Sequence, residues 1–304
     1  MSLRQAFTLI ELLVVIAVIG ILSGLIVISM NGVTNKANIA KSQVFSNSLK
    51  NALLANLISE WKLDEISGIS ATDSWGTNTG TVIGGTFISS DCIYGSCLSL
   101  TGSSSYVDLG NNTSLLSVFD SGKSFTYSIW FYPTSLPPSS YWDWIVCKAY
   151  TSHVSPYYQI QTLIRPTAYI ESNVFNNTGS TYITGISSPT GSVILNTWHY
   201  LAISVDLASS KHRMYLNGSL ISPTIATNGT YINYTTPLAL GNNKNIYTSS
   251  YGFNGKLDDF RVFDSFIPLS QIKEQYFAGL NNLFLTKQIT SVEYLQRVDS
   301  VAQN

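Results

Sequence analysis

The stretch SFTYSIWFY, residues 124–132, decides most of the fold. Its side chains form two alternating sets: Phe125, Tyr127, Ile129 and Phe131 against Thr126, Ser128, Trp130 and Tyr132. Successive side chains of a β-strand point to opposite faces, so this alternation predicts a strand with one face in an apolar core.

Other segments have the same character. YYQIQTLI (157–164) and TWHYLAISVD (197–206) are strand-like, and HRMYLNGSLI (212–221) places Asn217-Gly218 between two β-prone runs, a strong hairpin signal. Strands that recur at short intervals with turn residues between them predict an all-β sandwich.

Composition narrows the function classes. The 304 residues carry a formal net charge of −1 with no basic block, which gives no electrostatic case for binding nucleic acid. Only 11% of residues are charged, whereas 45% are hydrophobic, which excludes a disordered chain.

Two of the three cysteines are spaced so that they could form a disulfide, which would imply an oxidising compartment. Cys92 and Cys97 bracket CIYGSC, whose glycine lets the chain turn, and we expect a disulfide between them. The alternative is a pair of reduced, half-buried thiols. Zinc is not expected because no second Cys/His pair stands nearby, and Cys147 is predicted to be an unpaired, buried strand residue.

The N-terminus is a different kind of segment. Residues 7–30 are almost entirely apolar and would extend about 36 Å as a helix, enough to cross a bilayer of about 30 Å. The run is too long for a secretory signal peptide, and Arg4 favours a cytoplasmic N-terminus. A plain membrane anchor would leave Glu11 unexplained.

The segment RQAFTLIELLVVIAVIGIL, residues 4–22, resembles the class III signal of type IV pilins and type II secretion pseudopilins. The resemblance implies a leader, residues 1–6, that prepilin peptidase cuts between Ala6 and Phe7, N-methylation of Phe7, and Glu11 as the assembly carboxylate. The sequence departs from the family at Ala6, where glycine is usual, and lacks the mid-helix proline of major pilins.

Glu11 then acquires a physical role. A carboxylate in the middle of a membrane helix costs roughly 2.5–3.5 kcal/mol. If Glu11 meets the new ammonium of Phe7 on a neighbouring subunit, both charges are compensated, and subunits in register are favoured. The alternative is that Glu11 only reaches the lipid headgroups.

An amphipathic pattern continues from Asn31 to Ile58, so we expect one membrane and assembly helix over residues 7–58, about 78 Å long. The implied partners are further copies of the chain in a helical filament, the pilus assembly machinery, and the inner membrane before assembly.

Six phrases after the helix occur in an informative order: WKLDEISGISATDSWGTNTGTVIGG, CLSLTGSSSYVDLG, SFTYSIWFYP, NTWHYLAISVD, MYLNG and GFNGKLDDFRVFDSFIPLSQI. Together they resemble laminin G-like (concanavalin A-like) jelly-roll domains of the bacterial pentraxin-like type. The resemblance implies a head over residues 59–266, made of two antiparallel sheets whose first and last strands, around EWKLDE and LDDFRVF, are paired.

Catalysis is not expected. Glycoside hydrolysis needs two suitably spaced carboxyl groups, but Glu171 is the only glutamate in the central strands and no Glu-x-Asp-x-Glu occurs. His153, His199 and His212 lack metal-ligand spacing, and no Gly-x-Ser-x-Gly elbow is present, although a dispersed Ser/His/Asp arrangement stays open.

Ligand binding is the alternative role for the head. The segment 137–158 gathers aromatic residues beside amides and hydroxyls, a combination that suits sugar rings. We expect Tyr141, Trp142, Tyr150 and Tyr157 to form the binding surface. The alternative is that about half of the aromatic residues in segment 137–158 belong to the core, with Trp144 and Tyr158 as the first candidates.

The family resemblance also implies a possible structural calcium ion near the paired terminal strands, although no cofactor is required. Asp258 matches the family's carboxylate by position, with Asp64 and Asp73 nearby. Alternation predicts that Asp258 and Asp259 point to opposite faces. Hydrogen bonding of Asp258 and Asp259 to turns and to Arg261 is the alternative.

Residues 267–304 return to helical spacing, and Thr290 with Glu293 forms a capping box, so a short helical hairpin is expected. The whole is therefore an α+β chain: a pilin helix, a jelly-roll sandwich and a C-terminal helical hairpin. The expected function is a filament subunit, inserted in the inner membrane and then displayed outside the cell, whose lectin-like head adheres to surfaces, with glycans as first candidates. The alternatives are a structural pilin with a decorative head and a type II secretion pseudopilin.

Overall fold

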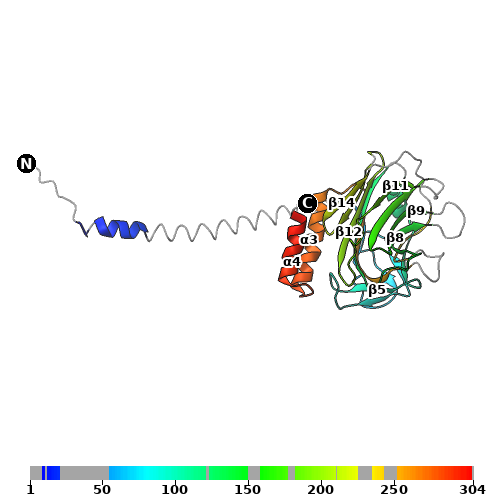
Figure 1. The fold of residues 1–304 in the computed structure, drawn as a ribbon, viewed down its shortest axis with the longest axis horizontal. Helices are drawn as coiled ribbons and strands as arrows, with labels where there is room; N and C mark the ends of the chain where they lie inside the picture. Colours follow the sequence, from blue (N-terminus) through cyan, green and yellow to red (C-terminus); the bar gives the residue numbers. More distant parts are fainter. Residues whose placement is uncertain are drawn as a thin grey trace, which may run out of the picture. The chain divides into compact units, whose positions relative to one another are not determined.

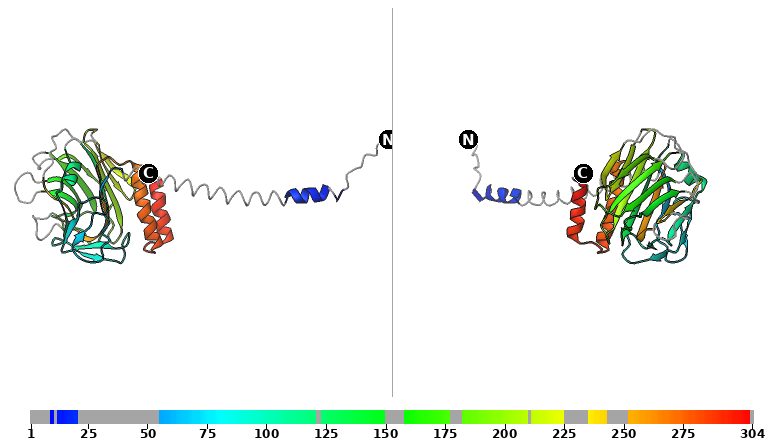
Figure 2. Two further views of the ribbon diagram at one scale, coloured as in Figure 1. Left: turned by 180° about the vertical axis from the view of Figure 1, so that it is seen from behind. Right: turned by 45° about the vertical axis from the view of Figure 1, so that its right-hand side comes forward.

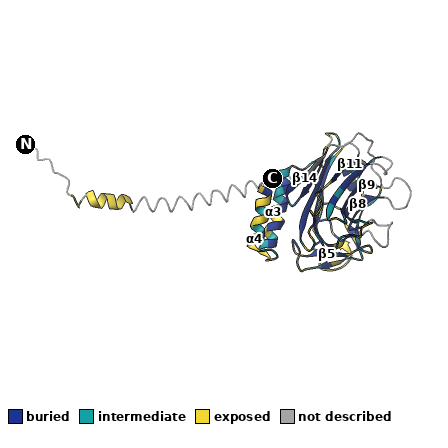
Figure 3. Cartoon of the chain, viewed as in Figure 1, coloured by how far each residue is buried: buried dark blue, intermediate teal, exposed yellow. Residues whose placement is uncertain are grey.

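A computed structural model describes residues 9–10, 12–20, 55–120, 123–149, 158–176, 182–209, 211–224, 235–242 and 252–302. The chain divides into two compact units, residues 1–52 and 53–304. In the first unit, residues 9–10 and 12–20 are helical and exposed (Figures 1 and 3). Ala6, Phe7, Glu11 and most of the long predicted helix lie outside the described residues. Among those that are described, no helix combines the length and apolar character needed to cross a membrane.

The second unit is a sandwich of two antiparallel sheets, here called sheet I and sheet II (Figures 1 and 2). Sheet I has the order β14 (Ser219–Thr224), β13 (Lys211–Leu216), β12 (His199–Asp206), β7 (Ser124–Pro133), β16 (Asn254–Phe263), β5 (Cys97–Thr101) and β4 (Thr86–Ile88), with β1 (Leu57–Trp61) paired to β16. Sheet II has the order β11 (Tyr182–Ser187), β10 (Tyr169–Phe175), β9 (Tyr158–Arg165), β8 (Asp143–Ala149), β15 (Leu238–Leu240), β6 (Tyr106–Gly110), β3 (Gly80–Ile83) and β2 (Ser70–Ala71). A short helix, α2 (Thr113–Val118), follows β6.

The alternation of residues 124–132 is confirmed in β7. Phe125, Tyr127, Ile129 and Phe131 all lie in the core between the sheets. Trp130 points the other way, into a second apolar cluster on the outer face of sheet I. A single strand therefore supplies side chains to both cores.

The first and last strands of the head are paired, as the family resemblance implies. Glu60 lies opposite Arg261 and Trp61 opposite Phe260. The predicted helix end at Ile58 and head start at residue 59 need correction, because β1 begins at Leu57. Leu57 pairs with Phe263, and its apolar side chain is buried in the sandwich unit.

Three local predictions are confirmed. Asn217 and Gly218 join β13 to β14 with φ values of 51° and 77°, the left-handed conformation that a two-residue turn of this kind requires. Cys92 and Cys97 form a disulfide. Cys147 is a free, buried residue of β8.

The predicted C-terminal helical hairpin is present as α3 (Leu269–Leu285) and α4 (Ser291–Ala302). It covers the outer face of sheet I, on the side away from β8 and β9 (Figure 1). The ring of Tyr276 stacks on Trp130 with centroids 5.7 Å apart, and a Cβ added to Gly279 would lie 2.3 Å from Trp130 Cζ2. The amide of Glu293 donates to Thr290 Oγ1 at 3.2 Å, which confirms the cap.

A polar network crosses the interior between the sheets. Tyr127 Oη and Thr162 Oγ1 are 2.6 Å apart, and Thr162 Oγ1 donates to Ser172 Oγ at 3.1 Å. Ser172 Oγ is 3.3 Å from His212 Nε2, and Thr184 Oγ1 is 3.2 Å from His212 Nδ1. Burial lowers the pKa of His212 to about 3, so the imidazole is neutral.

Candidate functional site

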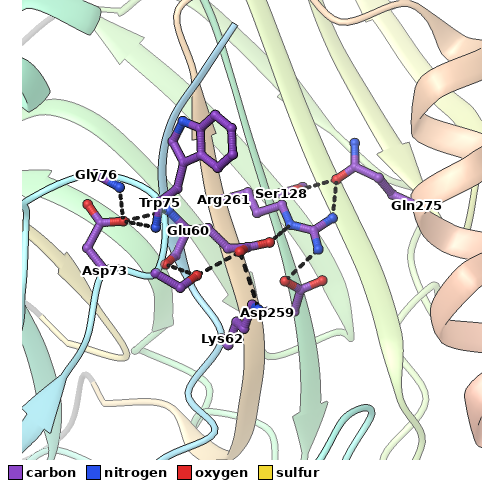
Figure 4. Close-up of polar contacts among 10 residues, drawn as sticks. Glu60, Lys62, Asp73, Trp75, Gly76, Ser128, Asp259, Arg261 and Gln275 are labelled. Carbon is purple, nitrogen blue, oxygen red and sulfur yellow. Dashed lines mark hydrogen bonds and ion pairs between the residues drawn. The ribbon is translucent and has the colours of Figure 1, made fainter. Parts of the chain in front are cut away.

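The paired terminal strands meet helix α3 in one polar network (Figure 4). Arg261 Nε donates to Glu60 Oε1 at 2.9 Å, and its Nη2 lies 3.0 Å from Asp259 Oδ1. Arg261 Nη1 donates to Gln275 Oε1 of α3 at 3.2 Å, and Ser128 Oγ of β7 donates to the same oxygen. The guanidinium therefore joins the first strand, the last strand and the C-terminal hairpin.

The electrostatics follow from this arrangement. Burial alone would raise the pKa of Glu60, but Arg261, Ser74 and Lys62 together hold the pKa below its ordinary value. Burial raises the pKa of Asp259, and Arg261 opposes that rise. Arg261 thus compensates two carboxyl groups, and its own pKa is raised by Asp259 and Glu60 against the effect of burial.

The three residues predicted to hold calcium have other partners. Asp258 Oδ2 accepts from the backbone amides of Ile93 and Tyr94 at 2.8 and 3.2 Å. Asp64 Oδ1 accepts from the amide of Ser96 at 2.9 Å, so both carboxylates hold the loop closed by the disulfide. Asp73 instead orders its own turn (Figure 4), with Oδ1 accepting from Gly76 and Oδ2 from Asn78 at 2.8 and 2.9 Å.

The structure does not gather Asp64, Asp73 and Asp258 into one group of metal ligands. Within the described stretches of the chain, no group of three or more His, Cys, Asp or Glu side chains is arranged to hold a metal ion. Asp258 Oδ1 is buried without a hydrogen-bond partner, but Asp73 is engaged elsewhere. Calcium binding remains a prediction.

The expectation that Asp258 and Asp259 point to opposite faces is wrong. The register of β16 shifts between Asp258 and Arg261, and Asp259 has a φ of 49°. This bulge interrupts the alternation. Burial and then the charge of Asp259 raise the pKa of Asp258 well above its ordinary value, so the two carboxyl groups lie within each other's field.

The outer face of sheet II is the second candidate region, since the hairpin covers the outer face of sheet I. Ile160, Ile164, Ile170 and Val174 face the core between the sheets. Strand alternation therefore turns Gln161, Leu163, Glu171 and Asn173 outward. Trp144, Cys147, Leu163 and Ala239 form a separate apolar cluster on this outer face.

An aromatic and ion-pair group lies at one part of this face. The rings of Trp142 and Trp144 meet edge to face with centroids 6.1 Å apart, and the guanidinium of Arg165 lies 5.1 Å from the centroid of Trp142. Arg165 Nε donates to Glu171 Oε2 at 2.7 Å. Arginine over a tryptophan face is a favourable cation–π arrangement.

The structure describes two of the four aromatic residues that are predicted to form a binding surface. Trp142 joins this group, and Tyr141 is half-buried in the turn before β8, where its amide donates to the carbonyl of Pro138. Trp144 is fully buried, but in the apolar cluster on the outer face of sheet II and not in the core between the sheets. Tyr150 and Tyr157 lie outside the described residues.

Two amide side chains on this face were not predicted from the sequence as site residues. Gln161 and Asn173 lie directly opposite each other on β9 and β10. Asn173 Nδ2 donates to Glu171 Oε1 at 2.6 Å. A signal was present in the sequence, because Gln161 follows Gln159 and Asn173 follows Glu171 at a spacing of two. Polar strand residues usually lie on ordinary solvated faces, however, so the spacing alone did not single them out.

The groups that could suggest catalysis are otherwise engaged. Ser172 and His212 come together, but both are buried between the sheets, where no substrate reaches them, and the other histidine nitrogen contacts Thr184 rather than a carboxylate. Glu171 is bound by Arg165 and Asn173. The absence of an enzymatic role remains an expectation.

The first unit presents apolar side chains without cover. Leu9, Ile10, Leu12, Leu13, Ile16 and Ile19 are all more than half exposed. Such a continuous apolar surface needs lipid or further protein around it.

The fold is that of a lectin-like jelly roll, and in the sequence it follows a pilin-type N-terminal segment. The chain belongs to the concanavalin A-like lectin/glucanases superfamily, whose family model matches residues 101–273. A second family model, the prokaryotic N-terminal methylation motif, matches residues 1–27. Both resemblances drawn from the sequence are thereby confirmed.

Solved structures show the same fold. The receptor-binding domain of botulinum neurotoxin C/D mosaic serotype is 15% identical, with a TM-score of 0.59 over 75% of this chain and 52% of that chain. Domain 4 of AbnA, a GH43 extracellular arabinanase from Geobacillus stearothermophilus solved with arabinotriose, is 16% identical, with a TM-score of 0.51 over 72% and 97%.

The ligand-binding domain of botulinum neurotoxin serotype D, solved with N-acetylneuraminic acid, is 15% identical with a TM-score of 0.58 over 76% and 53%. The chain spans about half the length of these neurotoxin domains. No curated protein matches the sequence.

Proposed function

We propose that this chain is a type IV pilin-like filament subunit that displays its sandwich head outside the cell, where the head adheres to glycans. The observation that carries the proposal is the presence of both family matches in one chain, the methylation motif at residues 1–27 and the concanavalin A-like domain at 101–273.

The structure gives the proposal three supports. The N-terminal helix exposes apolar side chains that suit a membrane and then a filament core. The head is a compact unit with its own core and a disulfide, which suits an extracellular setting. Two solved structures of the same fold contain a bound sugar, arabinotriose and N-acetylneuraminic acid.

Filament localisation and ligand binding are separable tests. Cells producing the chain are sheared, and the filament and envelope fractions are probed for the head. We expect the chain in the filaments, and its confinement to the envelope would favour a secretion pseudopilin.

The same filaments are applied to a glycan array, with filaments lacking the chain as the control. We expect glycan binding that depends on the chain. Filaments that contain the head but bind no glycan would favour a structural subunit with a decorative head.

A further inference from the structure

The outer face of sheet II carries one cross-strand row of small or uncharged side chains. The pairing register places Gly185, Asn173, Gln161, Cys147, Ala239 and Asp108 side by side on six neighbouring strands. Asp108 is the only charged member of this row. The two amides at its centre are the groups with the greatest capacity for hydrogen bonding.

Gln161 is the unusual member of the row. Its side chain is 5% exposed, yet it makes no hydrogen bond anywhere in the part of the chain that the structure describes. Gln159, two residues earlier, donates to the carbonyl of Phe119 at 3.2 Å. The amide of Gln161 keeps some contact with solvent, so water can bond to it in the free protein and a ligand hydroxyl can take the place of that water.

The charged groups beside these amides cancel each other. Glu171 Oε2 accepts a hydrogen bond from Arg165 Nε at 2.7 Å, and Glu171 Oε1 accepts one from Asn173 Nδ2 at 2.6 Å. Asn173 Oδ1 remains available as an acceptor next to Gln161. The subsite therefore offers amide donors and acceptors with no uncompensated charge.

We infer that Gln161 and Asn173 form a subsite for an uncharged, hydroxyl-rich ligand, and that the glycans bound by the head are neutral rather than acidic. A sugar hydroxyl both donates and accepts, so it can match an amide that does the same. This inference rests on the proposed function and specifies which face of the head carries it.

The test uses the full-length chain in detergent micelles with neutral and sialylated glycans on one array, followed by titration of the best neutral glycan. Gln161→Leu removes the amide and keeps similar bulk. Gln296→Leu, at an exposed position of α4, is the matched control. Thermal unfolding of all three proteins is measured alongside.

We expect Gln161→Leu to weaken binding of the neutral glycan by about tenfold, the effect of one or two lost hydrogen bonds. Its melting temperature should change little, because the amide bonds to no protein group in the part of the chain that the structure describes. Gln296→Leu should bind as the wild type does. The combination separates a ligand-binding residue from a structural one.

Three outcomes would overturn the inference in different ways. If wild-type protein binds neutral glycans and Gln161→Leu binds them equally well, the subsite is wrong although the proposed function stands. Preference of the wild type for sialylated glycans would refute the neutral ligand class. Binding of no glycan by the wild type refutes the proposed function, and this inference falls with it.

Discussion

Replacing Arg261 with glutamine is expected to destabilise the head strongly. Arg261 contacts Glu60, Asp259 and Gln275 at 2.9, 3.0 and 3.2 Å, and no other cation is found as close to Asp259 in the described part of the head. Removing one partner of a buried ion pair costs about 3–5 kcal/mol because a charge is left uncompensated.

We expect the loss in free energy of unfolding to lie at the lower end of that range. The side chain of Arg261 retains 20% exposure, so solvent screens part of the loss, and about 3 kcal/mol is expected. For a domain of this size, that corresponds to a fall in melting temperature of about 6–12 °C. Differential scanning fluorimetry of a fragment spanning residues 53–304 measures it.

The pH dependence gives a second check. Without Arg261 the pKa of Asp259 rises further and Glu60 loses the partner that lowers its pKa, so both can take up protons in the folded state as the pH falls. The loss of stability caused by Arg261→Gln should therefore be smaller at pH 4 than at pH 7.

Lys62→Gln provides the control, because Lys62 is 53% exposed and lies 3.9 Å from Glu60 Oε2. Such a surface pair contributes about 0–1 kcal/mol. If Arg261→Gln lowers the melting temperature no more than Lys62→Gln does, or by the same amount at both pH values, the reasoning about this network is wrong.

Three further perturbations test other parts of the head. Gly279→Val should release the C-terminal hairpin from sheet I, seen as rapid proteolysis of α3 and α4, because a Cβ there would lie 2.3 Å from Trp130 Cζ2; unchanged resistance would contradict the packing. Replacing Cys92 and Cys97 together with serine should cost about 2 kcal/mol in urea unfolding, as the loss of a small closed loop predicts, and identical midpoints with and without the disulfide would refute this. The pKa of Asp258 is raised in the folded protein, so folding opposes its ionisation and the wild type loses stability as the pH rises above the ordinary pKa of 3.8. Asp258→Asn, which cannot ionise, should have a melting temperature that depends less on pH and that is no lower than the wild-type value at pH 7. A calcium-dependent rise in the wild-type melting temperature that Asp258→Asn abolishes would instead support the predicted ion.

Much of the fold is readable from the sequence because its signals are local. Alternation in residues 124–132 determines which side chains face the core, and Asn217-Gly218 determines a turn by its backbone preference alone. The pairing of β1 with β16 joins residues about 200 positions apart. Only the family resemblance predicts this pairing, because the alternation of side chains within a strand does not indicate which other strand lies beside it.

The candidate sites were harder to predict because they depend on packing. The bulge at Asp259 breaks the alternation from which its direction was inferred. The family resemblance implies that Asp64 and Asp258 are ligands for an ion. The structure shows both carboxylates accepting hydrogen bonds from the disulfide loop, which no spacing in the sequence indicates. Gln161 stands out only once its burial and its lack of partners are known.

The central claim is that this chain is processed as a pilin and assembled into a surface filament. Mass spectrometry of the N-terminal peptide from sheared, purified filaments tests it most directly. The account predicts a peptide that begins at Phe7 and carries one added methyl group on its amine. A filament-derived peptide that retains residues 1–6, or one that begins at an unmethylated residue beyond Phe7, would contradict it.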